Sequence, residues 1–307
     1  MRPEISYSVE PPLATSPFPN HPDMLAVPYR EEPVIISTLR NGDGARGMTD
    51  SAYFEVDGVP NWIGHKGVNL EITPPDNYVE MIGTNKSLSM FPDFYEQLLI
   101  ERQVEYALFF GGHDISDVFG EAADVRKDSK YGFQPHRDIQ NGYFIDAAEK
   151  LGLDIFGVCR PTGEYLLKNG ARLSEAEPHH RPEDPNDDPL VHKVSSLWVP
   201  DTIYPELEPI ETVNSHHHKQ VKLRDLDQER LLNKGWYVYY VDSTHGVNDD
   251  SAVEILVRLR DDGSVNGVLF QSHPERFNSE DGLKMRKWMH SVIQNSHQRR
   301  LDLQKAA

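Results

Sequence analysis

Hydrophobic and polar positions along this chain alternate between short apolar runs and stretches of helical periodicity. Compact β-branched and aromatic runs predict buried strands at residues 34–38, 106–110 and 154–158. Apolar residues recur at helical spacing over 87–103, and further helices are predicted over about 137–151 and from just after Cys159. Strands that alternate with helices favour a mostly parallel sheet covered on both faces.

The second half of the chain is richer in strand-like runs. These runs predict strands at 191–198, 209–213, 236–241, 251–259 and 265–271. Residues 174–188 are rich in Pro, Asp, Glu and His and predict a loop, and a last helix is expected over about 279–295. We find no internal repeat or linker, so we expect one α/β domain over 34–300 with an added antiparallel region. Residues 1–33 hold eight of the 22 prolines and predict an irregular arm.

Composition narrows the range of partners. The 307 residues carry a formal net charge of −18, so the average surface repels phosphate, and we expect no binding to nucleic acid or to anionic membranes. No apolar run approaches the roughly 20 residues that a membrane span needs. The N-terminus also lacks the pattern of a secretory signal, so we expect a cytoplasmic protein.

The single cysteine, Cys159, lies where strand gives way to helix. Gly157 lies two residues before Cys159 and Gly163 lies four residues after it, as in a sharp strand-turn-helix nucleophile elbow. Pro161 suits the first turn of a helix. A helix N-terminus stabilises a thiolate and raises its reactivity. The alternative is a buried structural cysteine, because free cysteine is among the most buried residue types.

Two further segments complete a candidate active site. His273 and Glu275 flank a proline in an extended segment, so the carboxylate can orient the imidazole from behind, as in a catalytic triad. Gly111 and Gly112 end a buried run, and one of their amides could form an oxyanion hole with that of Arg160. Taken alone, the glycine pair would indicate only a tight turn.

These motifs, in this order, resemble those of class I glutamine amidotransferase domains, nearest the stand-alone branch that includes γ-glutamyl-γ-aminobutyrate hydrolases. The resemblance rests on the segments 111–115, 157–160, 213–218 and 271–275, with supporting similarity at 137–138 and 253–255. It implies a flavodoxin-like α/β fold with a Cys159, His273 and Glu275 triad, an oxyanion hole at Gly112 and Arg160, and hydrolysis of a γ-glutamyl amide through a thioester. It further implies substrate-binding positions at Gly111, His113, Asn214, Ser215, His216 and His217.

The chain departs from the family pattern beside the nucleophile. Pro161 replaces a family glycine and leaves the Arg160 amide in place, whereas Gly163 replaces a glutamine that helps to hold glutamine as substrate. Ser272 stands where the family carries a bulky aromatic residue, which should open or polarise the pocket wall. The resemblance therefore supports the catalytic triad more firmly than it supports free glutamine as the substrate.

Histidines gather at 216–218, with His179, His180 and His192 elsewhere. Neighbouring histidines in a strand point to opposite faces, and no carboxylate accompanies a helical His-x-x-x-His spacing. We therefore expect substrate contact or polar packing from them rather than a metal site, and we expect no cofactor.

Three hypotheses of function follow. The chain is a free-standing hydrolase of γ-glutamyl amides, a glutaminase subunit that passes ammonia to a separate synthetase, or a non-catalytic binding or regulatory homologue. The expected partner in the first two is a small γ-glutamyl amide or glutamine. A homodimer is left open.

Overall fold

The computed structural model of the chain describes residues 35–38, 95–96, 99–100, 106–109, 111, 115, 135–181, 190–197, 203–274 and 279–306. The predicted arm at 1–33, most of the predicted helix at 87–103, and Gly112, His113 and Glu275 lie outside these residues. Within this predicted helix, residues 95–96 and 99–100 are helical.

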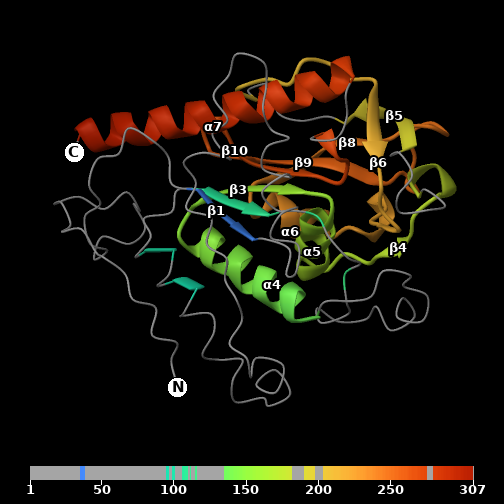
Figure 1. Cartoon of the computed structure of the whole chain (residues 1–307), viewed down its shortest axis with the longest axis horizontal. Coiled ribbons are helices and arrows are strands. Elements are labelled where there is room, and N and C mark those ends of the chain that lie inside the picture. Colours follow the sequence, from blue (N-terminus) through green and yellow to red (C-terminus); the bar gives the residue numbers. More distant parts are fainter. Residues whose placement is uncertain are drawn as a thin grey trace, which may run out of the picture.

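An eight-stranded mixed sheet forms the centre of the fold (Figure 1). Its parallel half consists of β1 (Ile35–Thr38), β2 (Tyr106–Phe109), β3 (Asp154–Val158) and β10 (Val265–Phe270), in that order. The sheet continues antiparallel through β9 (Val253–Leu259), β8 (Trp236–Asp242), β5 (Leu190–Ser196) and β6 (Thr212–Ser215). A separate two-stranded sheet pairs β4 (Ser174–Glu175) with β7 (Lys219–Gln220).

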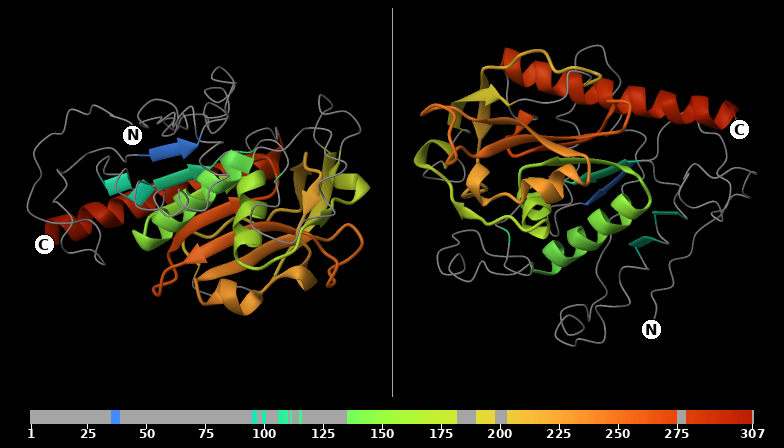
Figure 2. Two further views of the ribbon diagram at one scale, coloured as in Figure 1. Left: turned by 90° about the horizontal axis from the view of Figure 1, so that it is seen from below. Right: turned by 180° about the vertical axis from the view of Figure 1, so that it is seen from behind.

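Helices cover both faces of this sheet, as two further views show (Figure 2). The long helix α7 (Glu280–Ala306) packs on one face, while α4 (Pro135–Lys150) and α5 (Arg160–Lys168) pack together on the other. The short helix α6 (Gln228–Leu232) adjoins β8, and single 3₁₀ turns lie at η4 (Pro178–His180) and η5 (Leu223–Asp225).

Alternate residues of β3 pack into two separate hydrophobic cores. Phe156 and Val158 of β3 pack with residues of α7, whereas Ile155 between them packs with residues of α4 and α5. Successive side chains of a strand point to opposite faces, so a continuously apolar strand can be buried on both sides. This is why Ile155, Phe156 and Val158 of β3 are all apolar, rather than alternating with polar residues.

The predicted α/β fold class with an added antiparallel region is confirmed, and three predicted boundaries change. The strand predicted at 209–213 lies at 212–215, and the last helix runs to Ala306 rather than to about 295. The segment predicted as loop at 174–188 contains β4 and η4 among its described residues. This last difference matters because η4 carries two histidines of the site described below.

No helix in the part of the chain described here combines the length and the apolar character that crossing a membrane requires.

Replacing Phe156 with alanine should lower the free energy of unfolding by about 3–5 kcal/mol, because Phe156 is 1% exposed and its ring lies 6.1 Å from that of Tyr106. Urea unfolding would measure this loss. Leu303→Ala is the control, since Leu303 is 60% exposed and should change stability by less than about 0.5 kcal/mol. Equal effects of the two changes would contradict the assignment of Phe156 to the core.

Candidate active site

Cys159 occupies a sharp turn between β3 and α5. Its backbone has φ 65° and ψ −105°, and it is the one non-glycine residue of the described segments with positive φ. Its N–H donates to the carbonyl oxygen of Phe270 at 2.6 Å, and its own carbonyl accepts from the N–H of Thr162 at 3.0 Å. The side-chain hydroxyl of Thr162 also donates to Phe270 O, at 2.8 Å. The cysteine therefore lies at a strained strand-to-helix elbow, as the sequence predicted.

Close packing explains the glycine two residues before the cysteine. A Cβ added at Gly157 would lie 2.7 Å from Leu269 Cδ2 and 2.9 Å from Pro161 Cβ. A larger residue there would have to displace the end of the Leu269 side chain and the Pro161 ring in the first turn of α5. Gly157 thus allows the elbow to fold back against β10.

Gly111, Cys159 and His273 meet at one point. A Cβ built on Gly111 would lie 3.3 Å from Cys159 Cβ and 3.4 Å from His273 Cε1. Cys159 and His273 are 6% and 4% exposed, so this meeting point is almost enclosed. Two of the three predicted triad residues are therefore neighbours at the carboxyl ends of β3 and β10, where ligands bind in α/β sheets.

Asn214 positions the backbone of His273. The His273 N–H lies 3.1 Å from Asn214 Oδ1 and 3.3 Å from the Asn214 carbonyl oxygen, and Asn214 is fully buried. The preceding Ser272 is also fully buried, and its hydroxyl has no hydrogen-bond partner among the described residues. Ser272 therefore leaves an unsatisfied polar atom beside the histidine.

The space beside Gly163 is filled by another residue. A Cβ at Gly163 would lie 2.6 Å from Ile115 Cδ1 and 3.7 Å from Leu173 Cδ2. Ile115 itself is 5% exposed. An apolar side chain thus occupies the place that a residue at 163 would need.

The Arg160 side chain forms a buried ion-pair network behind the elbow. Its guanidinium contacts Asp138 and lies 2.7 Å from Glu164 Oε1, while Asn141 Nδ2 donates to Glu164 Oε2 at 2.7 Å. All four residues are at most 3% exposed. Burial alone would lower the pKa of Arg160, but Glu164 and Asp138 outweigh it and raise that pKa above its ordinary value. Arg160 is therefore charged and ties α5 to α4.

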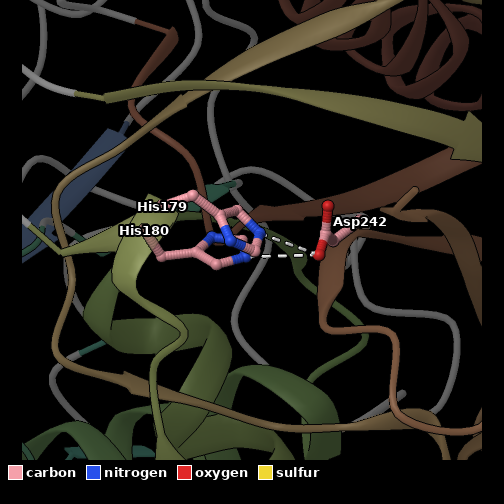
Figure 3. Close-up of side chains that lie close together, drawn as sticks. All are labelled: His179, His180 and Asp242. Atoms are coloured by element: carbon pink, nitrogen blue, oxygen red, sulfur yellow. Dashed lines mark hydrogen bonds and ion pairs between the residues drawn. The ribbon is translucent and has the colours of Figure 1, made fainter. Parts of the chain in front are cut away.

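A second cluster of titratable side chains lies beside His273, in the antiparallel half of the sheet. We call it the histidine cluster; it consists of His179, His180, His192, His217, Asp242 and Glu254. Figure 3 shows the rings of His179 and His180 turned towards the carboxylate of Asp242, with Nε2–Oδ2 distances of 3.0 and 3.6 Å. On its other side the His180 ring approaches Glu254, with Nδ1 3.5 Å from Oε1.

Burial sets the protonation of this cluster. It lowers the pKa of His192 to about 4 and that of His217 well below its usual value, so both imidazoles are neutral near pH 7. It also raises the pKa of Glu254 to about 8. Burial would raise the pKa of Asp242 as well, but hydrogen bonds from His180, Thr244 and His179 outweigh this and leave that pKa below its ordinary value.

The predicted substrate-binding residues fall into two groups. Gly111 and Asn214 contact His273 directly, and the ring centroid of His216 lies 6.4 Å from that of His273. Ser215 and His217 instead belong to the surroundings of Glu254. Ser215 Oγ lies 3.2 Å from His180 Nδ1 and 3.3 Å from His192 Nδ1.

The premise that residues 216–218 lie within a strand is wrong. β6 ends at Ser215, and the three histidines form the connection to β7, held in part by a hydrogen bond from the His217 N–H to His180 O at 3.3 Å. Strand alternation therefore does not decide which of their side chains meet.

Sequence reasoning missed Asp242 and Glu254 as members of a site. The available signal was Glu254 itself, a carboxylate inside the otherwise apolar run 252–257. A charge in a buried strand has to be paired or ligated, because an isolated buried charge is very costly. Asp242 ends its strand and carried no such signal.

Comparisons with known proteins give structural likeness at low sequence identity. No family model and no curated protein matches the chain. The glutaminase domain of CTPS from Trypanosoma brucei, solved with acivicin bound, is similar with a TM-score of 0.53 at 10% identity, over 86% of this chain and 94% of that one. The likeness to the CTPS domain shows a glutamine amidotransferase-type fold.

Two more distant structures are of the same kind. A candidate GMP synthase component from Thermoplasma acidophilum has a TM-score of 0.49 at 14% identity, over 90% of this chain and 100% of that one. A Thermotoga maritima glutamine amidotransferase has a TM-score of 0.40 at 11% identity, over 88% of this chain and 86% of that one.

Arg160→Gln should lower the free energy of unfolding by about 3–5 kcal/mol, since it leaves Asp138 and Glu164 buried side by side without their cation. The deficit should shrink as pH falls from 7 towards 5, because protonation relieves the repulsion between the two carboxylates. Denaturant unfolding at several pH values would measure both effects. Arg224→Gln is the matched control, because Arg224 and Asp250 are 54% and 55% exposed and their pair should be worth less than about 1 kcal/mol. A pH-independent loss in Arg160→Gln would contradict the electrostatic account.

Proposed function

We propose that this protein hydrolyses a γ-glutamyl amide by cysteine-dependent catalysis. The observation that carries the proposal is the close approach of Gly111, Cys159 and His273, in which a Cβ added at Gly111 would lie within 3.4 Å of both Cys159 Cβ and His273 Cε1. Cys159 also directly precedes α5, at the end of the helix where the dipole is positive. The glutamine amidotransferase-type fold supports this type of chemistry.

The proposed mechanism has two halves. The Cys159 sulfur attacks the amide carbon, and His273 takes up the thiol proton. Main-chain amides at Gly112 and Arg160 stabilise the oxyanion. The tetrahedral intermediate then collapses, and His273 donates the proton to the leaving nitrogen, which departs as ammonia or an amine.

The second half releases the acid. His273 takes a proton from water as the water attacks the thioester carbon, and the intermediate expels the cysteine sulfur, which recovers that proton. The product is a γ-carboxylate. Glu275 orients the imidazole throughout and keeps the correct tautomer.

The surroundings of Gly163 favour a substituted γ-glutamyl amide over free glutamine. In the resembled family a glutamine side chain at this position helps to hold the substrate, whereas here Ile115 fills the space. The substrate therefore lacks a polar contact on this side. We propose that binding depends more on the leaving amine than it does in a glutaminase.

A second candidate is a glutaminase subunit that supplies ammonia to a separate synthetase. The structural likeness to a CTPS glutaminase domain favours it, because that domain's name describes glutamine hydrolysis within a synthetase. In this case the substrate is glutamine, and turnover depends on the partner protein.

Replacing Cys159 with alanine, His273 with glutamine, or Glu275 with glutamine should each lower kcat about 10³-fold or more, because the three groups act as one unit. Amine or ammonia release measured by coupled assay would test this. His245→Gln and Glu280→Gln are matched controls, since both side chains are exposed and neither belongs to the proposed triad. Turnover that survives in Cys159→Ala would rule out the proposed nucleophile. Turnover of neither substrate class by the native protein would favour the non-catalytic alternative.

Substrate preference separates the two catalytic candidates. The purified chain should release amine from a panel of γ-glutamyl amines with a kcat/KM at least about tenfold above that for ammonia release from glutamine. The physical reason is the polar contact that is lost at Gly163. A reversed preference, or glutamine turnover that appears only when a synthetase is added, would establish the glutaminase subunit instead.

A further inference from the structure

We propose that His180, His192, His217 and Glu254 form a binding site for a divalent transition-metal ion, with Zn²⁺ as the best fit. The site is separate from the proposed chemistry of Cys159 and does not depend on it. It also goes against the expectation from sequence that these histidines serve substrate contact or polar packing.

The spacing of the side chains suits one tetrahedral ion. Three imidazoles converge on Glu254 Oε1, with His192 Nε2 at 3.4 Å, His180 Nδ1 at 3.5 Å and His217 Nε2 at 4.0 Å. Ligand atoms bonded to Zn²⁺ at 2.0–2.1 Å in a tetrahedron are themselves separated by about 3.3–3.4 Å. His180, His217 and Glu254 each offer a ligand atom that lies within 4.8 Å of the other two. His192 approaches the same carboxylate oxygen and completes the proposed set of four by side-chain rotation.

Three of the four residues turn unsatisfied polar atoms to this centre, and the fourth, His180, has its Nδ1 3.2 Å from Ser215 Oγ. Both carboxylate oxygens of Glu254, His192 Nε2 and His217 Nε2 lack a hydrogen-bond partner among the described residues. Glu254 is fully buried, and His192 and His217 are 4% and 5% exposed. Buried polar atoms are nearly always paired, so a group of them aimed at one another indicates a missing ligand.

The outer nitrogens of the rings face the kinds of partner that metal-bound histidines use, and those of His217 and His192 lie within hydrogen-bond distance of them. His217 Nδ1 donates to Lys219 O at 3.0 Å, which leaves the lone pair of Nε2 directed at Glu254. His180 turns its Nε2 to the carboxylate of Asp242 at 3.6 Å, and His192 Nδ1 lies 3.3 Å from Ser215 Oγ. Such contacts fix the tautomer and orientation of a metal-bound imidazole.

The neighbouring group of His179, His180 and Asp242 is a weaker candidate. Asp242 already accepts hydrogen bonds from the Thr244 N–H at 2.9 Å and from the His179 ring at 3.0 Å (Figure 3). Its carboxylate is thus occupied as an acceptor, and it serves the site better as the outer partner of His180.

A metal here would join segments that are far apart in sequence. Its ligands come from η4, β5, the β6–β7 connection and β9, all on the side of the sheet next to His273. The ion would therefore fix the position of the η4 turn against the antiparallel strands.

The test uses the full chain carrying Cys159→Ala, so that the thiol cannot bind metal. Isothermal titration with Zn²⁺ should show one site per chain, and Co²⁺ should give the intense visible absorption of a tetrahedral complex. X-ray absorption of the Zn²⁺ form should show nitrogen and oxygen ligands at about 2.0–2.1 Å with imidazole scattering. Absence of binding, or an octahedral spectrum typical of surface-bound ions, would overturn the proposal.

Variants locate the ion. Glu254→Gln and His192→Gln should each weaken Zn²⁺ binding about 100-fold or more, while His297→Gln, a buried histidine on α7, should leave it unchanged. Circular dichroism identifies any variant that fails to fold. If a variant does not fold, the Co²⁺ absorption and X-ray absorption spectra of the Cys159→Ala chain decide whether the site exists. Folded Glu254→Gln protein with undiminished Zn²⁺ affinity would show that the ion binds elsewhere, and would overturn the proposed site.

Discussion

The left-handed backbone of Cys159 is the constraint on which the rest of the site depends. A positive φ with a ψ of −105° costs a residue with a Cβ about 1–3 kcal/mol, which contacts with the surrounding structure have to offset. The Cys159 N–H is bound to the end of β10, and Pro161 packs where Gly157 has no side chain. The same turn starts α5, so the direction of the thiol and the axis of the helix are set together. The ion pairs of Arg160 then fix that helix to α4.

The parallel and antiparallel halves of the sheet contribute different residues to the site, and the two halves meet at β10. The parallel half supplies the elbow and the glycine that contacts it, in an arrangement typical of α/β folds. The antiparallel half brings Asn214 to the backbone of His273 and surrounds Glu254 with imidazoles. His273 thus lies between an apolar, tightly packed region and a buried polar one. Both regions determine the surroundings of the His273 side chain. Substitutions in either half of the sheet are therefore expected to alter those surroundings.

Local patterns predicted the elements better than their tertiary combinations. The strand 154–158 matches its predicted bounds, because a short β-branched run between turns has few alternatives. The extension of α7 beyond residue 295 was missed because its last turns carry no clear apolar stripe. Tertiary contacts support them instead, including Arg299 with Asp262 and Arg300 over the ring of Tyr106. The histidine cluster was equally hidden. The pairing of β5 with β8 and of β8 with β9 brings only His192, Asp242 and Glu254 together, and the other members come from η4 and from the β6–β7 connection.

The contact between Ile115 and Gly163 also has a consequence for how substitutions combine. Positions 115 and 163 lie on separate segments, yet an added Cβ at 163 would lie 2.6 Å from Ile115 Cδ1. A larger residue at 163 would have to displace the end of the Ile115 side chain, and a smaller residue at 115 alone would leave a cavity. The effects of substitutions at the two positions on the free energy of unfolding are therefore expected to be non-additive.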